Sequence, residues 1–200
     1  QTITLLEANL KPEQKVLILA PASLLYNWKE EFRKFVPHKQ VEVAYGTKTE
    51  SIKQIDKSAT ITITSYPSFR SDLEHYQKQS YDYLILDEAQ MIKNSQTKIA
   101  QALREFYVKT CYALSGTPIE NRLEEIWSIF QIVLPGLLPS KKEFSKLSPQ
   151  LVAKLIQPFV LRRKKDEVLT ELPELSEHLY SNELTSSQKT LYLAQLRRMQ

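Results

Sequence analysis

Short apolar runs alternate along the chain with longer segments in which apolar residues recur every three or four positions. Two runs, 16–20 and 83–86, are continuous, as expected of strands that are covered on both faces of a sheet. Three further runs, 41–45, 60–64 and 111–114, are also predicted to be strands. Strands separated by helices of this length form parallel sheets with right-handed crossovers, so the pattern predicts an α/β fold.

The segments between the runs have helical spacing. After a start signal at 21–23, four apolar residues recur at steps of four, four and three: Leu24, Trp28, Phe32 and Phe35. This spacing places Trp28 in the core rather than on a surface where it could stack on a base, and Trp127 is placed in the core likewise. Further helices are predicted at 47–57, 65–77, 96–106 and 123–134.

The pattern of apolar and polar residues changes near residue 138. Beyond it lie two polar helical segments, 141–147 and 149–157, then a basic run at 162–165, an extended stretch at 177–184 and a final helix from Ser186. The pattern predicts one α/β domain over 1–138 and a mainly helical C-terminal extension over 139–200.

Composition narrows the function classes only slightly. The 200 residues carry 27 Lys and Arg against 23 Asp and Glu, and a net charge of +4 is compatible with nucleic acid without arguing for it. The single cysteine excludes an internal disulfide framework, and no apolar run approaches the length of a membrane span. Only three glycines are present, where average usage would give about fourteen, so glycine-rich phosphate loops cannot be numerous.

Three polar signatures stand where predicted strands end: Pro21-Ala22-Ser23, Asp87-Glu88 and Ser115-Gly116-Thr117. Ligands of open parallel sheets bind at the carboxyl ends of the strands. Adjacent carboxylates at such a place are costly to leave unpaired, and Mg²⁺ held through Asp87, with Glu88 deprotonating a water, would remove that cost. The alternative is that both carboxylates point into solvent or accept N–H groups at the start of a helix.

Several segments together resemble a known family. Asp87-Glu88-Ala89-Gln90 is similar to motif II of superfamily-two helicases, and residues 83–94 resemble the form found in Swi/Snf-type DNA-dependent ATPases. Residues 19–32 are similar to motif Ia of that family, 63–66 to motif Ib and 115–128 to motif III, while 158–168 and 171–173 are like the stretch that follows its first lobe. The resemblance runs along nearly the whole chain, with the motifs in order.

The resemblance implies a P-loop NTPase fold of the RecA-like type, with three layers and helices on both faces of the sheet. It implies that the parent protein uses ATP and Mg²⁺ to move on double-stranded DNA. Asp87 would bind Mg²⁺, and Glu88 would act as general base. Gln90 stands where many relatives carry histidine, and its amide can still bridge to Ser115 or Thr117. Ser115, Gly116 and Thr117 would pass the state of the nucleotide to the DNA groove.

The same resemblance implies a set of residues that contact DNA, some of which have an alternative role. The predicted residues are Pro21, Ser23, Thr64, Ser65, Lys93, Asn94, Arg162 and Arg163. Pro21 and Ser23 precede a helix N-terminus, which favours phosphate. For Arg162 and Arg163 the resemblance favours bracing between this lobe and a second RecA-like lobe, which would be a partner within the same parent chain. The short segment between 138 and 158 favours bare duplex DNA over a nucleosome.

In the family, a phosphate loop (Walker A) stands immediately before a segment like Gln1–Leu6, so the chain is expected to start just after its own loop. We expect that these 200 residues alone do not hydrolyse ATP, and that the sheet has an exposed edge or a compensating contact between chains. The expected location is the cytoplasm or nucleoid of a prokaryote, or the nucleus of a eukaryote. Open alternatives are a strand-separating helicase for DNA or RNA, a non-enzymatic docking module and a metal-dependent phosphohydrolase.

Overall fold

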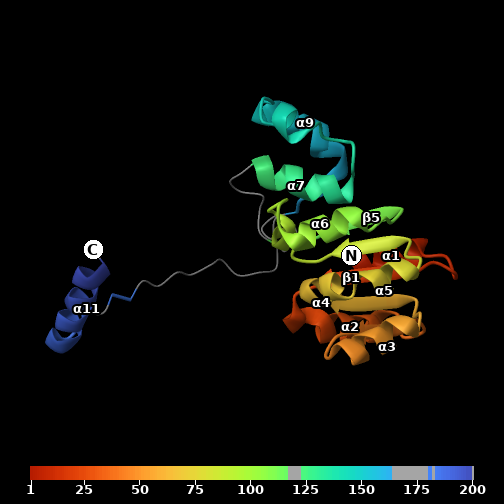
Figure 1. Ribbon diagram of the computed structural model, residues 1–200, viewed down its shortest axis with the longest axis horizontal. Helices are drawn as coiled ribbons and strands as arrows, with labels where there is room; N and C mark the ends of the chain where they lie inside the picture. The colour runs from red at the N-terminus through yellow and green to blue at the C-terminus, as the bar shows by residue number, and fades with distance from the viewer. Residues whose placement is uncertain (117–122, 164–179, 182, 200) are drawn as a thin grey trace. The chain divides into compact units, whose positions relative to one another are not determined.

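The computed structural model describes residues 1–116, 123–163, 180–181 and 183–199 (Figure 1). The chain divides into two compact units, Gln1–Phe159 and Val160–Gln200. The predicted site residue Thr117 lies outside the described residues.

The first unit is built on a five-stranded sheet in the order β2-β3-β1-β4-β5. The strands are β1 (Val16–Ala20), β2 (Val41–Ala44), β3 (Ile61–Ser65), β4 (Tyr83–Leu86) and β5 (Thr110–Ala113). All four neighbouring pairs are parallel. The parallel α/β sheet predicted from the alternating pattern is therefore confirmed, and each predicted strand is found within a residue or two of its expected place.

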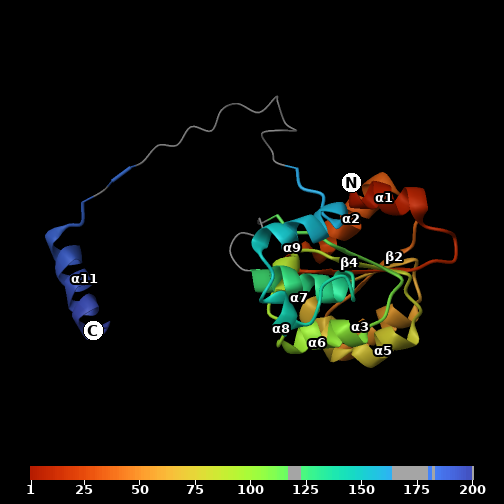
Figure 2. The same ribbon diagram turned by 90° about the horizontal axis from the view of Figure 1, so that it is seen from above.

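Helices cover both faces of the sheet, so the unit has three layers (Figure 2). One face carries α1 (Thr2–Asn9), the short 3₁₀ helix η1 (Ala22–Leu24) and α2 (Leu25–Phe35). The other carries α3 (Lys48–Asp56), α4 (Tyr66–Ser71), α5 (Leu73–Lys78) and α6 (Lys98–Glu105). Leu6, Leu25 and Phe32 belong to one core cluster, and Ile55, Phe69 and Leu103 belong to the other.

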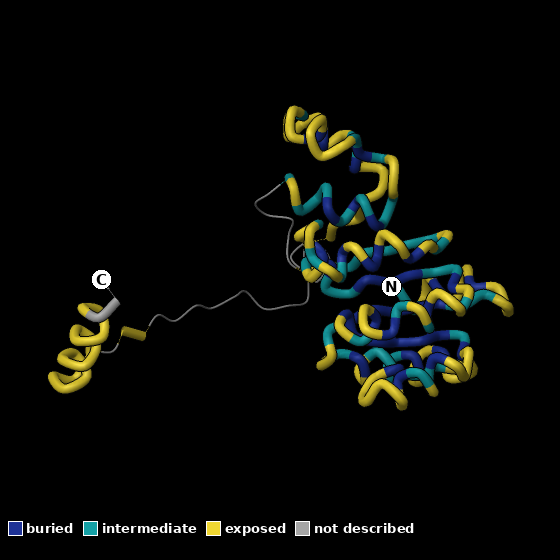
Figure 3. The backbone as a smooth tube through the Cα atoms, in the orientation of Figure 1, coloured by how far each residue is buried: buried dark blue, intermediate teal, exposed yellow. Residues whose placement is uncertain are grey.

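Strand β1 lies at the centre and is buried along its whole length (Figure 3). Its side chains alternate between the two core clusters: Leu17 and Leu19 join one, while Val16, Ile18 and Ala20 join the other. This arrangement explains the continuous apolar run, because a strand covered on both faces has no polar side.

Strand β5 is at one edge of the sheet, and all four of its residues are only partly buried. Among the described residues it pairs only with β4. This edge does not test the expectation of a missing phosphate-loop strand, which stays a prediction.

Two expectations about helices are wrong. The predicted helix over 65–77 is broken into α4 and α5 at Asp72, whose backbone (φ −111°, ψ 21°) leaves the helical region. Asp72 is buried, and its carboxylate accepts a hydrogen bond from Ser51 Oγ at 2.8 Å, so a contact with α3 occupies the break. Phe35, placed in the core by its spacing, is 59% exposed because it is the last residue of α2.

A third cluster brings part of the predicted extension into the first unit. Helices α7 (Leu123–Val133), α8 (Lys141–Phe144) and α9 (Pro149–Ile156) share a small core that includes Phe130, Phe144 and Val152. The 3₁₀ helix η3 (Gln157–Phe159) follows, and α11 (Ser186–Met199) belongs to the second unit. The contact boundary thus falls at 159/160, whereas the functional division at 138/139 stays a prediction.

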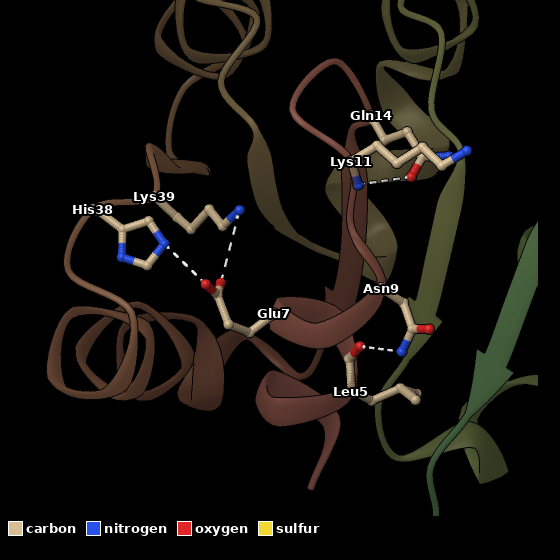
Figure 4. Close-up of polar contacts among 7 residues, drawn as sticks. All are labelled: Leu5, Glu7, Asn9, Lys11, Gln14, His38 and Lys39. Atoms are coloured by element: carbon tan, nitrogen blue, oxygen red, sulfur yellow. Dashed lines mark hydrogen bonds and ion pairs between the residues drawn. The ribbon is translucent and has the colours of Figure 1, made fainter.

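The N-terminal helix is held by polar contacts as well as by its apolar side. Glu7 of α1 receives His38 Nε2 at 3.0 Å and lies 3.7 Å from Lys39 Nζ, both residues being in the loop after α2 (Figure 4). Leu6, on the same helix, is buried beneath it. Both contacts tie α1 to the loop between α2 and β2. None of the helices among the described residues is both long and apolar enough to cross a membrane.

Candidate functional site

The carboxyl ends of four strands lie side by side. In the register of the sheet Ala20 is opposite Ser65, Leu19 is opposite Leu86, and Leu86 is opposite Ala113. The segments that follow β1, β4 and β5 are therefore neighbours, as the polar signatures at the strand ends predict.

Asp87 is held at both its backbone and its side chain. Its N–H donates to Leu19 O at 2.8 Å, and its carbonyl accepts the hydroxyl of Tyr66 at 2.6 Å. Oδ2 accepts Trp28 Nε1–H at 2.8 Å, and Oδ1 accepts the Glu88 N–H at 2.9 Å. Each carboxylate oxygen keeps a second lone pair. The partly buried Asp87 side chain therefore does not simply point into solvent.

Burial keeps the Tyr66 hydroxyl in its protonated form, in which it donates to Asp87. The Tyr66 side chain is almost fully buried, and that burial, followed by the nearby Asp87 charge, raises the pKa of the phenol far above its ordinary value. The phenol is therefore protonated at any physiological pH and remains a donor to the Asp87 carbonyl.

Glu88 and Ser115 are joined through Gln90. Gln90, in the 3₁₀ helix η2 (Ala89–Ile92), donates from Nε2 to Glu88 Oε2, and its Oε1 accepts Ser115 Oγ at 3.1 Å. The structure thus shows the expected amide bridge for Ser115. Glu88 adopts a left-handed backbone (φ 49°, ψ 55°), which is uncommon for a residue with a side chain. Such an outlier at a strand end is typical of functional sites, where packing sustains the strain.

A cavity of about 480 Å³ opens beside Asp87. Trp28 and Glu31 of α2 line it, together with Gln1 and Thr2 at the start of α1. Among the described residues, no side chain caps the start of that helix.

The residues at this cavity fit a magnesium–nucleotide complex. Mg²⁺ is usually bound through one or two carboxylates together with substrate phosphates and water, so a single aspartate with free lone pairs suffices. No group of three or more His, Cys, Asp or Glu residues capable of holding a metal occurs among the described residues.

Two contacts, not predicted from the sequence, tie the segment after Glu88 to α7. Ser128 is completely buried, and its hydroxyl donates to Ile92 O at 2.8 Å. Lys93 Nζ lies 3.5 Å from Glu125 Oε1. The only sequence signal for either contact is the polar Ser128 within an otherwise apolar helix stripe.

The predicted DNA contacts at the end of β3 have other partners. Thr64 is fully buried, and its hydroxyl donates to Ala44 O at 2.7 Å, so its side chain has no exposed surface from which to meet DNA. Ser65 is also buried and accepts the Ser68 N–H at 3.2 Å as the cap of α4. In the structure these two residues hold the end of the strand rather than face outward.

The other predicted DNA contacts are more accessible. Pro21 is partly buried and Ser23 is exposed, both at the start of the η1–α2 segment. Lys93 and Asn94 are exposed, although Lys93 is ion-paired and Asn94 Oδ1 accepts the Gln96 N–H at 3.0 Å. Arg162 and Arg163 are exposed and belong to the second compact unit. Gly116 is exposed beside Ser115.

Proteins of similar sequence include an ATP-dependent helicase and a TATA-binding protein-associated factor. The chain is 41% identical over 167 residues to an uncharacterized ATP-dependent helicase of Mycoplasma genitalium, covering 79% of this chain and 16% of that protein. It is 35% identical over 202 residues to the TATA-binding protein-associated factor MOT1 of Saccharomyces cerevisiae, covering 88% of this chain and 11% of that protein. The chain therefore spans less than a fifth of the length of either relative.

Solved structures agree with the sequences. The SWI2/SNF2 ATPase core of Sulfolobus solfataricus in complex with double-stranded DNA matches with a TM-score of 0.73 and 34% identity, over 98% of this chain and 44% of that one. The fold is therefore that of a SWI2/SNF2 ATPase core, which is RecA-like. The profile of the SNF2-related domain matches residues 1–200. The sheet, the linked strand ends and these matches together show that the chain belongs to the SNF2-related domain family.

Proposed function

We propose that the protein containing this chain hydrolyses ATP with Mg²⁺ and uses the energy to move along double-stranded DNA. Residues 1–138 are the first RecA-like lobe of that motor, and 139–200 lead toward a second lobe of the same parent chain. The observation that carries the proposal is the chain of contacts from Trp28 and Asp87 through Glu88 and Gln90 to Ser115.

Asp87 and Glu88 divide the chemistry between them. Asp87 lines the cavity with free lone pairs and would hold Mg²⁺, which when bound supplies positive charge against the phosphate oxygens. Glu88 accepts the proton of the attacking water, and the amide of Gln90 orients its carboxylate. The first turn of α1 lines the same cavity, where its N–H groups favour the negative charge of a triphosphate.

Gln90 couples the nucleotide end of the site to the segment after β5. A change in the position of Glu88 on hydrolysis would reach Ser115 through one side chain, and Gly116 and Thr117 continue from there. The amide of Gln90 does not titrate itself.

The DNA side is proposed for the exposed members of the predicted set. Ser23 and the start of α2, which has no side-chain cap, offer donors to a phosphate, and Asn94 and Lys93 lie on the segment that follows motif II. Arg162 and Arg163 contribute either phosphate contacts or bracing between lobes. Such contacts carry little sequence preference and depend strongly on salt.

The proposed cellular location follows from the proposed substrate, double-stranded DNA. A motor on chromosomal DNA belongs in the cytoplasm or nucleoid of a prokaryote, which the similarity to the Mycoplasma helicase favours, or in the nucleus of a eukaryote.

The proposal is tested by measuring phosphate release from ATP by the complete protein with duplex DNA, single-stranded DNA and RNA. The motor proposed here is stimulated most by duplex DNA and does not separate a labelled strand from a duplex. Equal stimulation by single strands together with strand separation would instead identify a strand-separating helicase. No nucleotide binding at all would favour a docking module.

A further inference from the structure

Trp28 stands out because its indole reaches a residue 59 positions away in the chain. Its Nε1–H donates to Asp87 Oδ2 at 2.8 Å, although its helical spacing alone places it in the core. The ring does pack on the core, with its centroid 6.0 Å from that of the buried Phe32. Trp28 therefore combines a firmly seated ring with a polar edge that points at the carboxylate.

The two side-chain bonds of Asp87 together define the plane of its carboxylate. The Glu88 N–H holds Oδ1, and the Trp28 indole holds Oδ2. Removing the Glu88 bond would require a change of backbone, whereas the Trp28 bond comes from another helix and is the one that a side-chain substitution can remove. An N–H that donates to an ionised oxygen makes a stronger bond than a neutral pair.

Trp28 and Asp87 also line the same cavity, beside the first turn of α1. The bond therefore lies at the wall of the space that the proposed function assigns to the magnesium–nucleotide complex. The indole has one donor and no acceptor, so it can orient the carboxylate without competing for its remaining lone pairs.

We propose that Trp28 is a positioning residue for Asp87. The indole N–H of Trp28 holds the Asp87 carboxylate in the orientation that receives Mg²⁺ with a nucleotide. The inference rests on the proposed function for the identity of the ligand. Partners that orient a metal ligand typically contribute about 10- to 100-fold to metal affinity. Without the indole donor, the carboxylate rotates more freely and Mg²⁺ binding weakens.

The test is calorimetric titration of Mg²⁺ into the complete protein in the presence of saturating ADP. Trp28 is replaced by phenylalanine and, separately, by 3-benzothienylalanine, which keeps the bicyclic shape and lacks the N–H. The matched control is Trp127→Phe, which removes the other indole donor of the chain, bonded to Pro139 O at 2.9 Å. We expect both Trp28 variants to bind Mg²⁺ about tenfold more weakly, with binding restored at high Mg²⁺, and the control to bind like the unmodified protein.

The outcomes separate the two proposals. If the benzothienylalanine variant binds Mg²⁺ as tightly as the unmodified protein, Trp28 serves only packing and the inference is wrong. A loss that high Mg²⁺ does not restore also overturns it, because it reports a damaged fold. If the unmodified protein and Trp127→Phe bind no magnesium–nucleotide complex, the proposed function itself fails.

Discussion

Gln90 shows how one side chain can connect two strand ends. Its amide donates to Glu88 and accepts from Ser115, so a single residue uses both of its polar functions in the site. Histidine could make the same two bonds only as the neutral imidazole, since the charged ring has two donors and no acceptor. The amide, unlike an imidazole, does not titrate.

The variant Gln90→His is expected to add a pH dependence to that of the unmodified protein. Free histidine titrates near pH 6.5, and the Glu88 carboxylate beside it raises that value. As the pH falls through this range the ring becomes charged and can no longer accept the Ser115 hydroxyl. We therefore expect the rate of DNA-stimulated ATP hydrolysis by the variant, divided by that of the unmodified protein, to decrease as the pH is lowered from about 7. The exposed Gln101→His is the control, and a ratio for Gln90→His that stays flat with pH would argue against the link.

At the scale of elements, the segment after β4 is held to α7 by a buried hydrogen bond. Ser128 Oγ donates to Ile92 O across two elements that are separated by 36 positions in the chain. The bond joins the small α7–α8–α9 core to the segment that follows Glu88.

Removal of this hydroxyl by Ser128→Ala is expected to lower the free energy of unfolding by about 1–3 kcal/mol, because the Ile92 carbonyl is left buried without its partner. Urea denaturation measures the change. Ser145→Ala, which removes a hydroxyl bonded only to the Lys142 carbonyl in the same exposed turn, should stay within about 0.5 kcal/mol of the unmodified protein. Equal effects of the two substitutions would show that the α7 contact contributes nothing special.

Strand β5 carries the one cysteine of the chain. The Cys111 side chain is partly buried and packs against the apolar core, and the loss of water around it raises the pKa of the thiol from 9.0 to about 12. Because the folded protein favours the neutral thiol, this contribution to stability is complete below pH 9.0 and is lost as the pH rises toward 12.

Two measurements check the thiol. At pH 8 the folded protein should react with an alkylating reagent far more slowly than the urea-unfolded protein. The loss of stability between pH 9 and 12 should also be smaller in Cys111→Ala than in the unmodified chain. Rapid labelling of the native protein would mean that the β5 edge opens readily.

At the scale of the whole chain, local patterns predict the architecture well because each strand is a short apolar run and each crossover a helix. The apolar runs at β1 and β4 are explained by burial on both faces of a parallel sheet. Polar residues come directly after each run, where the strand ends. The break at Asp72 and the bond from Trp28 to Asp87 were not predictable in this way. Each depends on a partner that the fold brings from another element, Ser51 in one case and Asp87 in the other.

The same limit applies to the DNA contacts. Thr64 and Ser65 carry hydroxyl groups at the end of a strand, which in sequence is compatible with contact to phosphate. The structure shows that both are buried and bonded within the fold. Burial at a strand end is decided by neighbouring elements, here β2 and α4, and a motif alone does not carry that information.

We propose above that Glu88 is the base of a DNA-stimulated ATPase. The most direct measurement is the rate of phosphate release by the complete protein at saturating duplex DNA, comparing Glu88→Gln with the exposed α6 control Glu105→Gln. We expect a loss of about 100-fold or more for Glu88→Gln, with DNA binding retained, and no loss for the control. Hydrolysis at the unmodified rate by Glu88→Gln would contradict this role of Glu88.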